Sequence, residues 1–128
     1  MFEELTKEVL KFINDKLTDR GINYDFGEKK PPIVHPYFVG DYSDLGSSTE
    51  DGLFESEFTL NGFTRGEWLT LENAREIIEE LFSDCTTILE NGSGVSISYS
   101  GCLIIPTGDS ELKRIQITLN IKEWKVTI

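Results

Sequence analysis

The stretch LFESEFTLNGFTRGEWLTLENAREIIEELF, residues 53–82, decides the fold because two different periodicities meet in it. Up to residue 61 the side chains alternate, and every second one is polar, which is typical of a strand with one buried face. After a break at residues 64–66, apolar residues recur at helical spacing and acidic residues fill the other side. We therefore predict a strand, a tight turn and an amphipathic helix. The inward positions are Phe54, Ser56, Phe58 and Leu60 on the strand, and Leu71, Ala74, Ile77, Ile78, Leu81 and Phe82 on the helix.

The chain on either side of this unit supplies one more helix and three more strands. Apolar residues recur at helical spacing from Phe2 to Leu17, and Gly21 is a suitable end for that helix. Residues 33–39 are strand formers, but Pro36 restricts them to a sheet edge or a bulge. The last two strands are expected at residues 95–105, with a bend at Gly101, and at residues 115–124. Residues 41–52 and 83–94 are polar and are expected to be loops.

The order of elements is therefore α-β-β-α-β-β in a chain of 128 residues, a length suited to one hydrophobic core. Consecutive strands with no helix between them favour antiparallel pairing. We predict a single α+β domain, residues 1–128, built as two layers. A mainly antiparallel sheet of about four strands would carry both amphipathic helices on one face.

The formal charge of −11 is concentrated in the middle of the chain. Residues 41–90 contain 13 acidic residues and only two basic ones, Arg65 and Arg75, whereas acids and bases balance in the rest. Proteins that grip nucleic acid need basic residues to neutralise phosphates, so this distribution argues against such a function. It permits a basic protein partner, or a surface past which DNA moves without specific binding.

No motif for catalysis, metal binding or cofactor binding stands out. His35 is the only histidine, and the glycines at residues 92 and 94 lack the remainder of a dinucleotide or phosphate-loop pattern. Cys85 and Cys102 have no metal-ligand spacing; we expect reduced thiols, with one disulfide as the open alternative. We therefore predict no catalytic residues, no metal, no cofactor and no membrane span, and keep a small hydrolase with paired carboxylates as a third reading.

The helix at residues 68–82 goes against two rules of helix electrostatics. Glu72, Glu76 and Glu80 follow one another at i, i+4 spacing, and Glu79 and Glu80 lie near the end where the helix dipole favours cations. Either this acidic face is kept for a partner, or it is a plain solvated face. Basic residues on the last strand, Lys113, Arg114 and Lys122, would suit the first reading. Head-to-tail contacts between the two surfaces would close into a ring.

Several segments resemble the small tail terminator, or tail completion, proteins of long-tailed bacteriophages and prophages. They are the N-terminal helix, IVHPYFVGDYSD, FESEFTLNGF leading into ENAREIIEELF, and IPTGDSELKRIQITLNIKEW near the end. The resemblance implies a structural protein that forms a hexameric ring, stops polymerisation of the tail tube and presents a surface to the head. It further implies three partners: other copies of itself, the tail tube protein and the head-closure or neck protein. DNA would pass through the channel, and the protein would be found in the host cytoplasm during assembly and then in the virion tail.

The residues expected at the ring or partner interface come from three places. The segment 41–52 is expected to be either an axial or inter-subunit contact or a plain solvated loop. The acidic helix and the last strand are the two remaining surfaces. The alternative function is an acidic immunity-type inhibitor that masks a basic partner such as a nuclease. The predicted interface residues are Tyr42, Asp44, Leu45, Glu72, Glu76, Glu79, Glu80, Lys113, Arg114 and Lys122.

Overall fold

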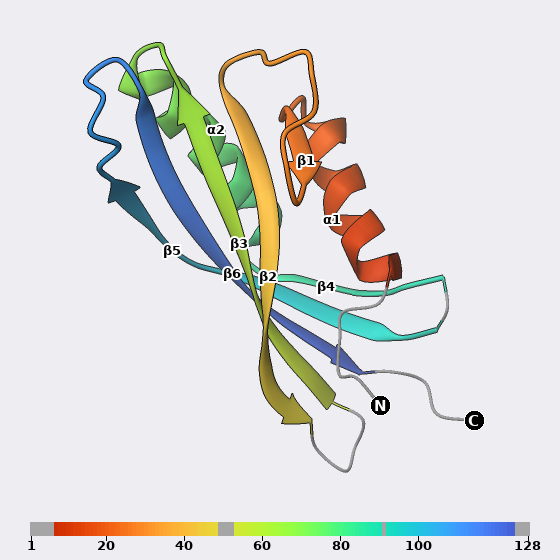
Figure 1. The fold of residues 1–128 in the computed structure, drawn as a ribbon. Helices are drawn as coiled ribbons and strands as arrows, with labels where there is room; N and C mark the ends of the chain where they lie inside the picture. Colours follow the sequence, from red (N-terminus) through yellow and green to blue (C-terminus); the bar gives the residue numbers. More distant parts are fainter. Residues whose placement is uncertain (1–6, 49–52, 91, 125–128) are drawn as a thin grey trace.

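The structure, a computed structural model, describes residues 7–48, 53–90 and 92–124, and contains two helices and a curled six-stranded sheet in that part of the chain (Figure 1). None of the described helices is long and apolar enough to cross a membrane. The elements in chain order are α1 (Lys7–Asp19), β1 (Tyr24–Phe26), β2 (Tyr37–Ser48), β3 (Leu53–Thr64), α2 (Trp68–Phe82), β4 (Cys85–Ile88), β5 (Gly94–Ile105) and β6 (Lys113–Trp124).

The sheet is mixed and has the strand order β1-β2-β3-β6-β5-β4. The pair β1 and β2 is parallel, and every other neighbouring pair is antiparallel. The predicted α+β class is confirmed, but the prediction of about four strands is wrong. The two strands that it missed, β1 and β4, have three and four residues, too few for an alternating pattern to separate them from loops.

The predicted loop at residues 41–52 is also a strand for most of its length. β2 runs to Ser48, and the structure does not describe residues 49–52. The polar sequence has no strand pattern. It becomes a strand because its backbone pairs with β3, with Asp41 opposite Thr59 and Tyr42 opposite Phe58. Residues 33–36, predicted as the start of the strand, lie before β2.

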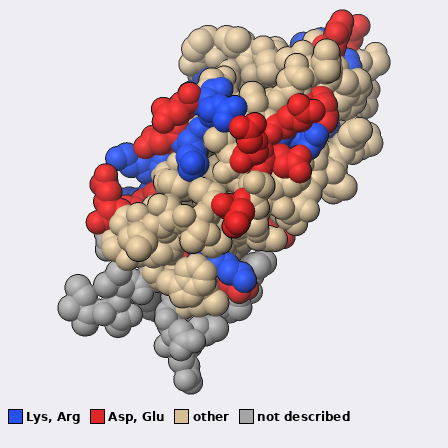
Figure 2. Space-filling model, turned by 180° about the vertical axis from the view of Figure 1, so that it is seen from behind, with Lys and Arg blue, Asp and Glu red and all other residues tan. Residues whose placement is uncertain are grey.

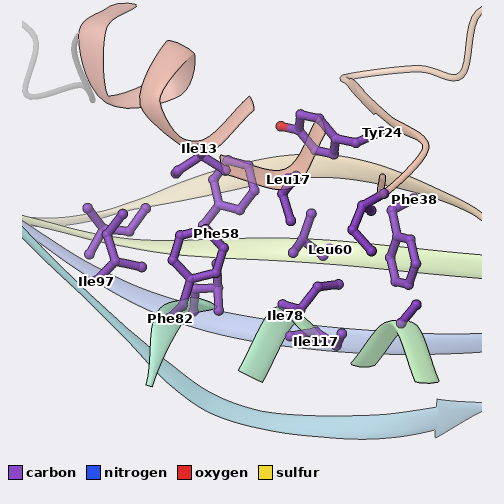
Figure 3. Packing of buried hydrophobic residues seen from close by; sticks show 14 of the residues in the cluster. Ile13, Leu17, Tyr24, Phe38, Phe58, Leu60, Ile78, Phe82, Ile97 and Ile117 are labelled. Carbon is purple, nitrogen blue, oxygen red and sulfur yellow. The ribbon is translucent and has the colours of Figure 1, made fainter. Parts of the chain in front are cut away.

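One face of the sheet carries the core. The register aligns Phe58 with Leu119, and Leu60 with Ile117, on the side covered by the helices, and side chains of α1 and α2 meet there (Figure 3). This arrangement confirms the predicted inward positions Ser56, Phe58 and Leu60, whereas the side chain of Phe54 lies outside the described residues. Helix residues of the core are Val9, Ile13 and Leu17 from α1, and Leu71, Ala74, Ile78 and Phe82 from α2.

A bulge lies in β5 where the sequence predicts a bend. The pairing with β6 shifts between Tyr99 and Gly101, so that Tyr99 lies opposite Leu119 and Cys102 lies opposite Ile117. Both therefore face the helix side, although they are three positions apart and a regular strand would point them to opposite faces. The bulge keeps Cys102 and Ile104 on the same side of the sheet as Val95 and Ile97.

Candidate assembly surface

Both edges of the sheet are only half covered. β1 pairs with residues 38–40 of β2, and β4 pairs with residues 94–97 of β5. Within the described part of the chain, no further strand pairs with the outer edge of residues 41–48 or of residues 98–105. An uncovered edge presents backbone N–H and C=O groups to any extended segment that approaches it.

The open half of β5 lacks charged side chains, one common protection of an edge strand, although it carries the bulge between Tyr99 and Gly101. Natural edges are commonly blunted by lysine or other charged side chains. Here residues 98–107, SYSGCLIIPT, contain no charge. The side chains of Leu103 and Ile104 are 62% and 68% exposed. This segment is therefore an edge that favours pairing with another strand.

An apolar notch lies beside this edge. Its volume is about 450 Å³, and it is formed between the N-terminal turn of α2 and the helix side of β5. Trp68 and Leu69 remain exposed at its rim. An exposed apolar patch next to an open strand edge is typical of a protein contact surface. The notch is lined by Trp68, Leu69, Leu71, Glu72, Cys102, Ile104 and Ile115.

The acidic face of α2 is partly neutralised. Arg75 forms ion pairs with Glu72 and, at 2.7 Å, with Glu79, and it donates a hydrogen bond of 3.3 Å to the hydroxyl of Tyr99. The hydrogen bond from Arg75 lowers the pKa of the Glu72 carboxyl below its usual range. The interpretation of α2 as a row of repelling glutamates is therefore incomplete.

Tertiary contact neutralises a further glutamate of α2. Arg20, just beyond α1, lies 3.7 Å from Glu80. Glu76 is exposed and has no ion pair with the described residues. Seen from behind, acidic and basic side chains are interspersed on the surface rather than gathered into one acidic field (Figure 2).

The predicted basic cluster is not one patch. Lys113 and Lys122 lie toward opposite ends of β6, opposite Thr64 and Glu55 respectively. Arg114 and Lys122 share the sheet face that the helices leave open, whereas Lys113 has the register of the other face. The three residues therefore cannot meet one partner at one point.

Arg114 instead ends a row of rings on the open face. Its guanidinium carbon lies 5.5 Å from the centroid of the Phe63 ring, and its Nη2 donates a hydrogen bond of 2.8 Å to Asn61. The ring of Tyr37 stacks on Phe63 at 5.1 Å, and exposed His35 follows at 5.4 Å. Sequence reasoning missed this row because the neighbours come from β2, β3 and β6.

The three predicted contact residues of segment 41–52 lie on β2. Tyr42 is half-buried on the helix side of the sheet, with its ring 6.1 Å from that of Phe26. The backbone of Asp44 and Leu45 belongs to the same strand, whereas their side chains are outside the described part of the structure. Tyr42 is thus a member of the extended core as well as a neighbour of the open β2 edge.

The groups able to perform chemistry are dispersed. Cys85 and Cys102 are free, half-buried thiols, and burial raises the pKa of both. Among the described residues, no group of three or more histidine, cysteine, aspartate or glutamate side chains is placed to hold a metal ion. The open β5 edge and the apolar notch are therefore the features around which a function can be argued.

Comparison with known proteins adds no relative. No protein-family model matches the chain, and no curated protein sequence matches it.

Proposed function

We propose that this chain is a non-catalytic assembly protein whose copies join into a ring. In its specific form, the proposal is a tail terminator of a long-tailed phage or prophage. The ring would cap the tail tube and join it to the head-closure complex. The observation that carries the proposal is the uncharged open edge of β5 beside the apolar notch.

The energetics of this edge favour a protein partner. Complete burial of a leucine or isoleucine side chain contributes about 1.5–3 kcal/mol. Leu103 and Ile104 each expose most of their side chain, so a contact that covers them gains a large part of that free energy. A strand that also satisfies the backbone groups of residues 98–105 adds direction and specificity.

The charge distribution suits a ring through which DNA passes. The β2–β3 hairpin projects past the two helices (Figure 1). The sequence from residue 41 to residue 64, which includes most of β2 and all of β3, contains six acidic residues and no basic one. Such a hairpin repels phosphate and would let DNA slide past without binding.

The specific form is tested with tail tubes assembled in vitro from the tail tube protein. The purified chain is added during polymerisation, and tube lengths and tube ends are examined by negative-stain electron microscopy. We expect shorter tubes with additional density at one end. Tubes of unchanged length with bare ends, at saturating concentrations of the chain, would contradict the tail-terminator role.

The acidic hairpin also favours the second candidate, an immunity-type inhibitor of a basic protein. That function needs a one-to-one complex and no self-assembly. Titration against a basic nuclease, followed by mass measurement of the complex, separates the two candidates. A tight one-to-one complex with loss of nuclease activity would favour the inhibitor.

A further inference from the structure

We propose that the open edge of β5 pairs with the open edge of β2 in a second copy, so that the sheets of successive copies join into one. This inference rests on the self-assembly proposed above and names the two surfaces that meet. They are residues 98–105 of one copy and residues 41–48 of the next. Each surface has eight residues and lacks a strand partner within the described structure.

Strand direction favours this pairing. β2, β3, β6 and β5 are neighbours in that order, and each is antiparallel to the next, so β5 runs opposite to β2. Two copies that point the same way therefore bring β5 of one against β2 of the other as an antiparallel pair. The contact is head to tail, and such contacts close into a ring when the rotation between copies allows it.

The two short edge strands set the position of the second copy. Through the ladder, residues 98–105 are level with residues 37–43 of the same chain, where β1 occupies the edge of β2. To meet residues 41–48, the second copy must move along the strands by about four residues, or roughly 13 Å at about 3.3 Å per residue. The strands would then be inclined to the ring axis, as they are in closed barrels.

The side chains match on both faces in the register that pairs residue 105 with residue 41. Ile104 then lies opposite Tyr42 of the second copy, and both have the register of the helix side. Ile105 lies opposite Asp41 on the open face. Arg114 is the ladder neighbour of Ile105, so Asp41 would be two strands from Arg114, about 10 Å. That separation exceeds the Debye length of about 8 Å at physiological salt, so this attraction adds little to the contact, which rests on the backbone pairing and the apolar side chains.

Pairing of like edges is less favourable. Two β2 edges would bring together two copies of the segment 41–48, each with two acidic residues and no basic one. Two β5 edges would cover Leu103 and Ile104 but leave residues 41–48 open. The head-to-tail contact covers both open edges of every copy with a single kind of interface.

Chemical crosslinking tests the inference. The variant carries Asp41→Cys and Leu103→Cys in a background with Cys85→Ser and Cys102→Ala, and it is treated with a short bismaleimide. In the proposed register these positions are diagonal neighbours, with side chains about 7–8 Å apart. Within one chain Leu103 is level with Val39 and three strand spacings from β2, about 14 Å. The short reagent therefore links different copies.

We expect a ladder of crosslinked species with the double variant, and a crosslinked dimer when the two single variants are mixed. Each single variant alone should give none. The matched control is Asp15→Cys with Leu103→Cys, because Asp15 is exposed on α1 and belongs to neither open edge; it should give no ladder. A dimer from the Leu103→Cys variant alone would overturn the inference in favour of paired β5 edges.

Native mass spectrometry of the same samples separates failure of the inference from failure of the proposed function. Oligomers that form without any crosslink between positions 41 and 103 would overturn the inference but would not contradict the proposed ring. A monomer at every concentration, with and without tail tubes, would overturn both.

Discussion

The ring of Phe38 on β2 lies over Gly62, its direct ladder partner on β3, and occupies the space that a side chain at position 62 would need. A Cβ atom on Gly62 would come within 2.3 Å of Cε2 of Phe38. Phe38 is buried and belongs to the core, so its ring cannot move away freely. A side chain at position 62 would therefore have to displace a ring of the core.

Gly62→Ala should therefore destabilise the fold by about 1–3 kcal/mol, the usual cost of overpacking. Urea unfolding monitored by circular dichroism measures the change. The matched control is Gly101→Ala, since no heavy atom lies within 4 Å of a Cβ built there. The control should stay within about 0.5 kcal/mol of the parent. Equal losses of stability in the two variants would show that the close contact with Phe38 does not cause the destabilisation.

Arg75→Ala should cost about 1 kcal/mol, because it removes two ion pairs and the hydrogen bond to Tyr99 and leaves neighbouring glutamates to repel. Arg20→Ala is the control, since its longer contact with Glu80 is largely exposed and should cost less than about 0.5 kcal/mol. Thermal unfolding of both variants measures the difference. A larger loss in Arg20→Ala would contradict the central place given to Arg75.

The carboxylate of Asp25 makes the fold sensitive to acid. It accepts hydrogen bonds from Nζ of Lys29 at 2.8 Å and from the backbone N–H of Lys30 at 3.1 Å, and the pKa of Asp25 is lowered chiefly by the bond from Lys29. Since the folded-state pKa lies below the ordinary value of 3.8, ionised Asp25 stabilises the fold above about pH 4. This contribution is lost as the pH falls through the folded-state pKa.

Asp25→Asn should consequently lower the free energy of unfolding at pH 7 by about 1–2 kcal/mol. It should also flatten the decline of stability below about pH 4. Urea midpoints measured across pH 2–7 (roughly the range that brackets the titration) test both effects. Glu28→Gln, at a neighbouring exposed position, is the control and should stay within about 0.5 kcal/mol of the parent at pH 7. If Asp25→Asn lost stability below about pH 4 as steeply as the parent does, the role of Asp25 in acid sensitivity would be contradicted.

Ile104→Lys should weaken self-association at least about tenfold without unfolding the domain, because it places a charge on the open β5 edge. The control is Ile88→Lys. Ile88 is 75% exposed and belongs to β4, outside the open half of β5. Sedimentation velocity over a concentration series measures association, and circular dichroism reports folding. Equal weakening by both substitutions would argue against a specific role for the β5 edge.

Long periodic segments made much of the fold predictable. The alternation around Phe58 and Leu60, the helical spacing after Trp68 and the bend at Gly101 are local signals, and each corresponds to β3, α2 or β5. β1, β4 and the second half of β2 were missed for a shared physical reason. Their short or polar sequences become strands through the hydrogen bonds of a neighbour that is distant along the chain.

The candidate surface was less predictable than the fold. The acids of α2 were identified, but Arg20 reaches Glu80 only through tertiary packing. Lys113 and Arg114 are adjacent in sequence, yet they have the register of opposite sheet faces. The open β5 edge had a visible signal, ten residues without charge at positions 98–107. The sequence alone does not show that this stretch is an open edge. That follows from the length of β4, which has four residues and pairs only with residues 94–97 of β5 within the described structure.

The central claim, that copies of this chain assemble into a ring, is tested most directly by native mass spectrometry of the purified protein, alone and after incubation with tail tubes. The account predicts one dominant closed oligomer, a hexamer in the tail-terminator form, that appears as the concentration rises or when tubes are present. A monomer under all these conditions, or only one-to-one complexes with a basic partner, would contradict it.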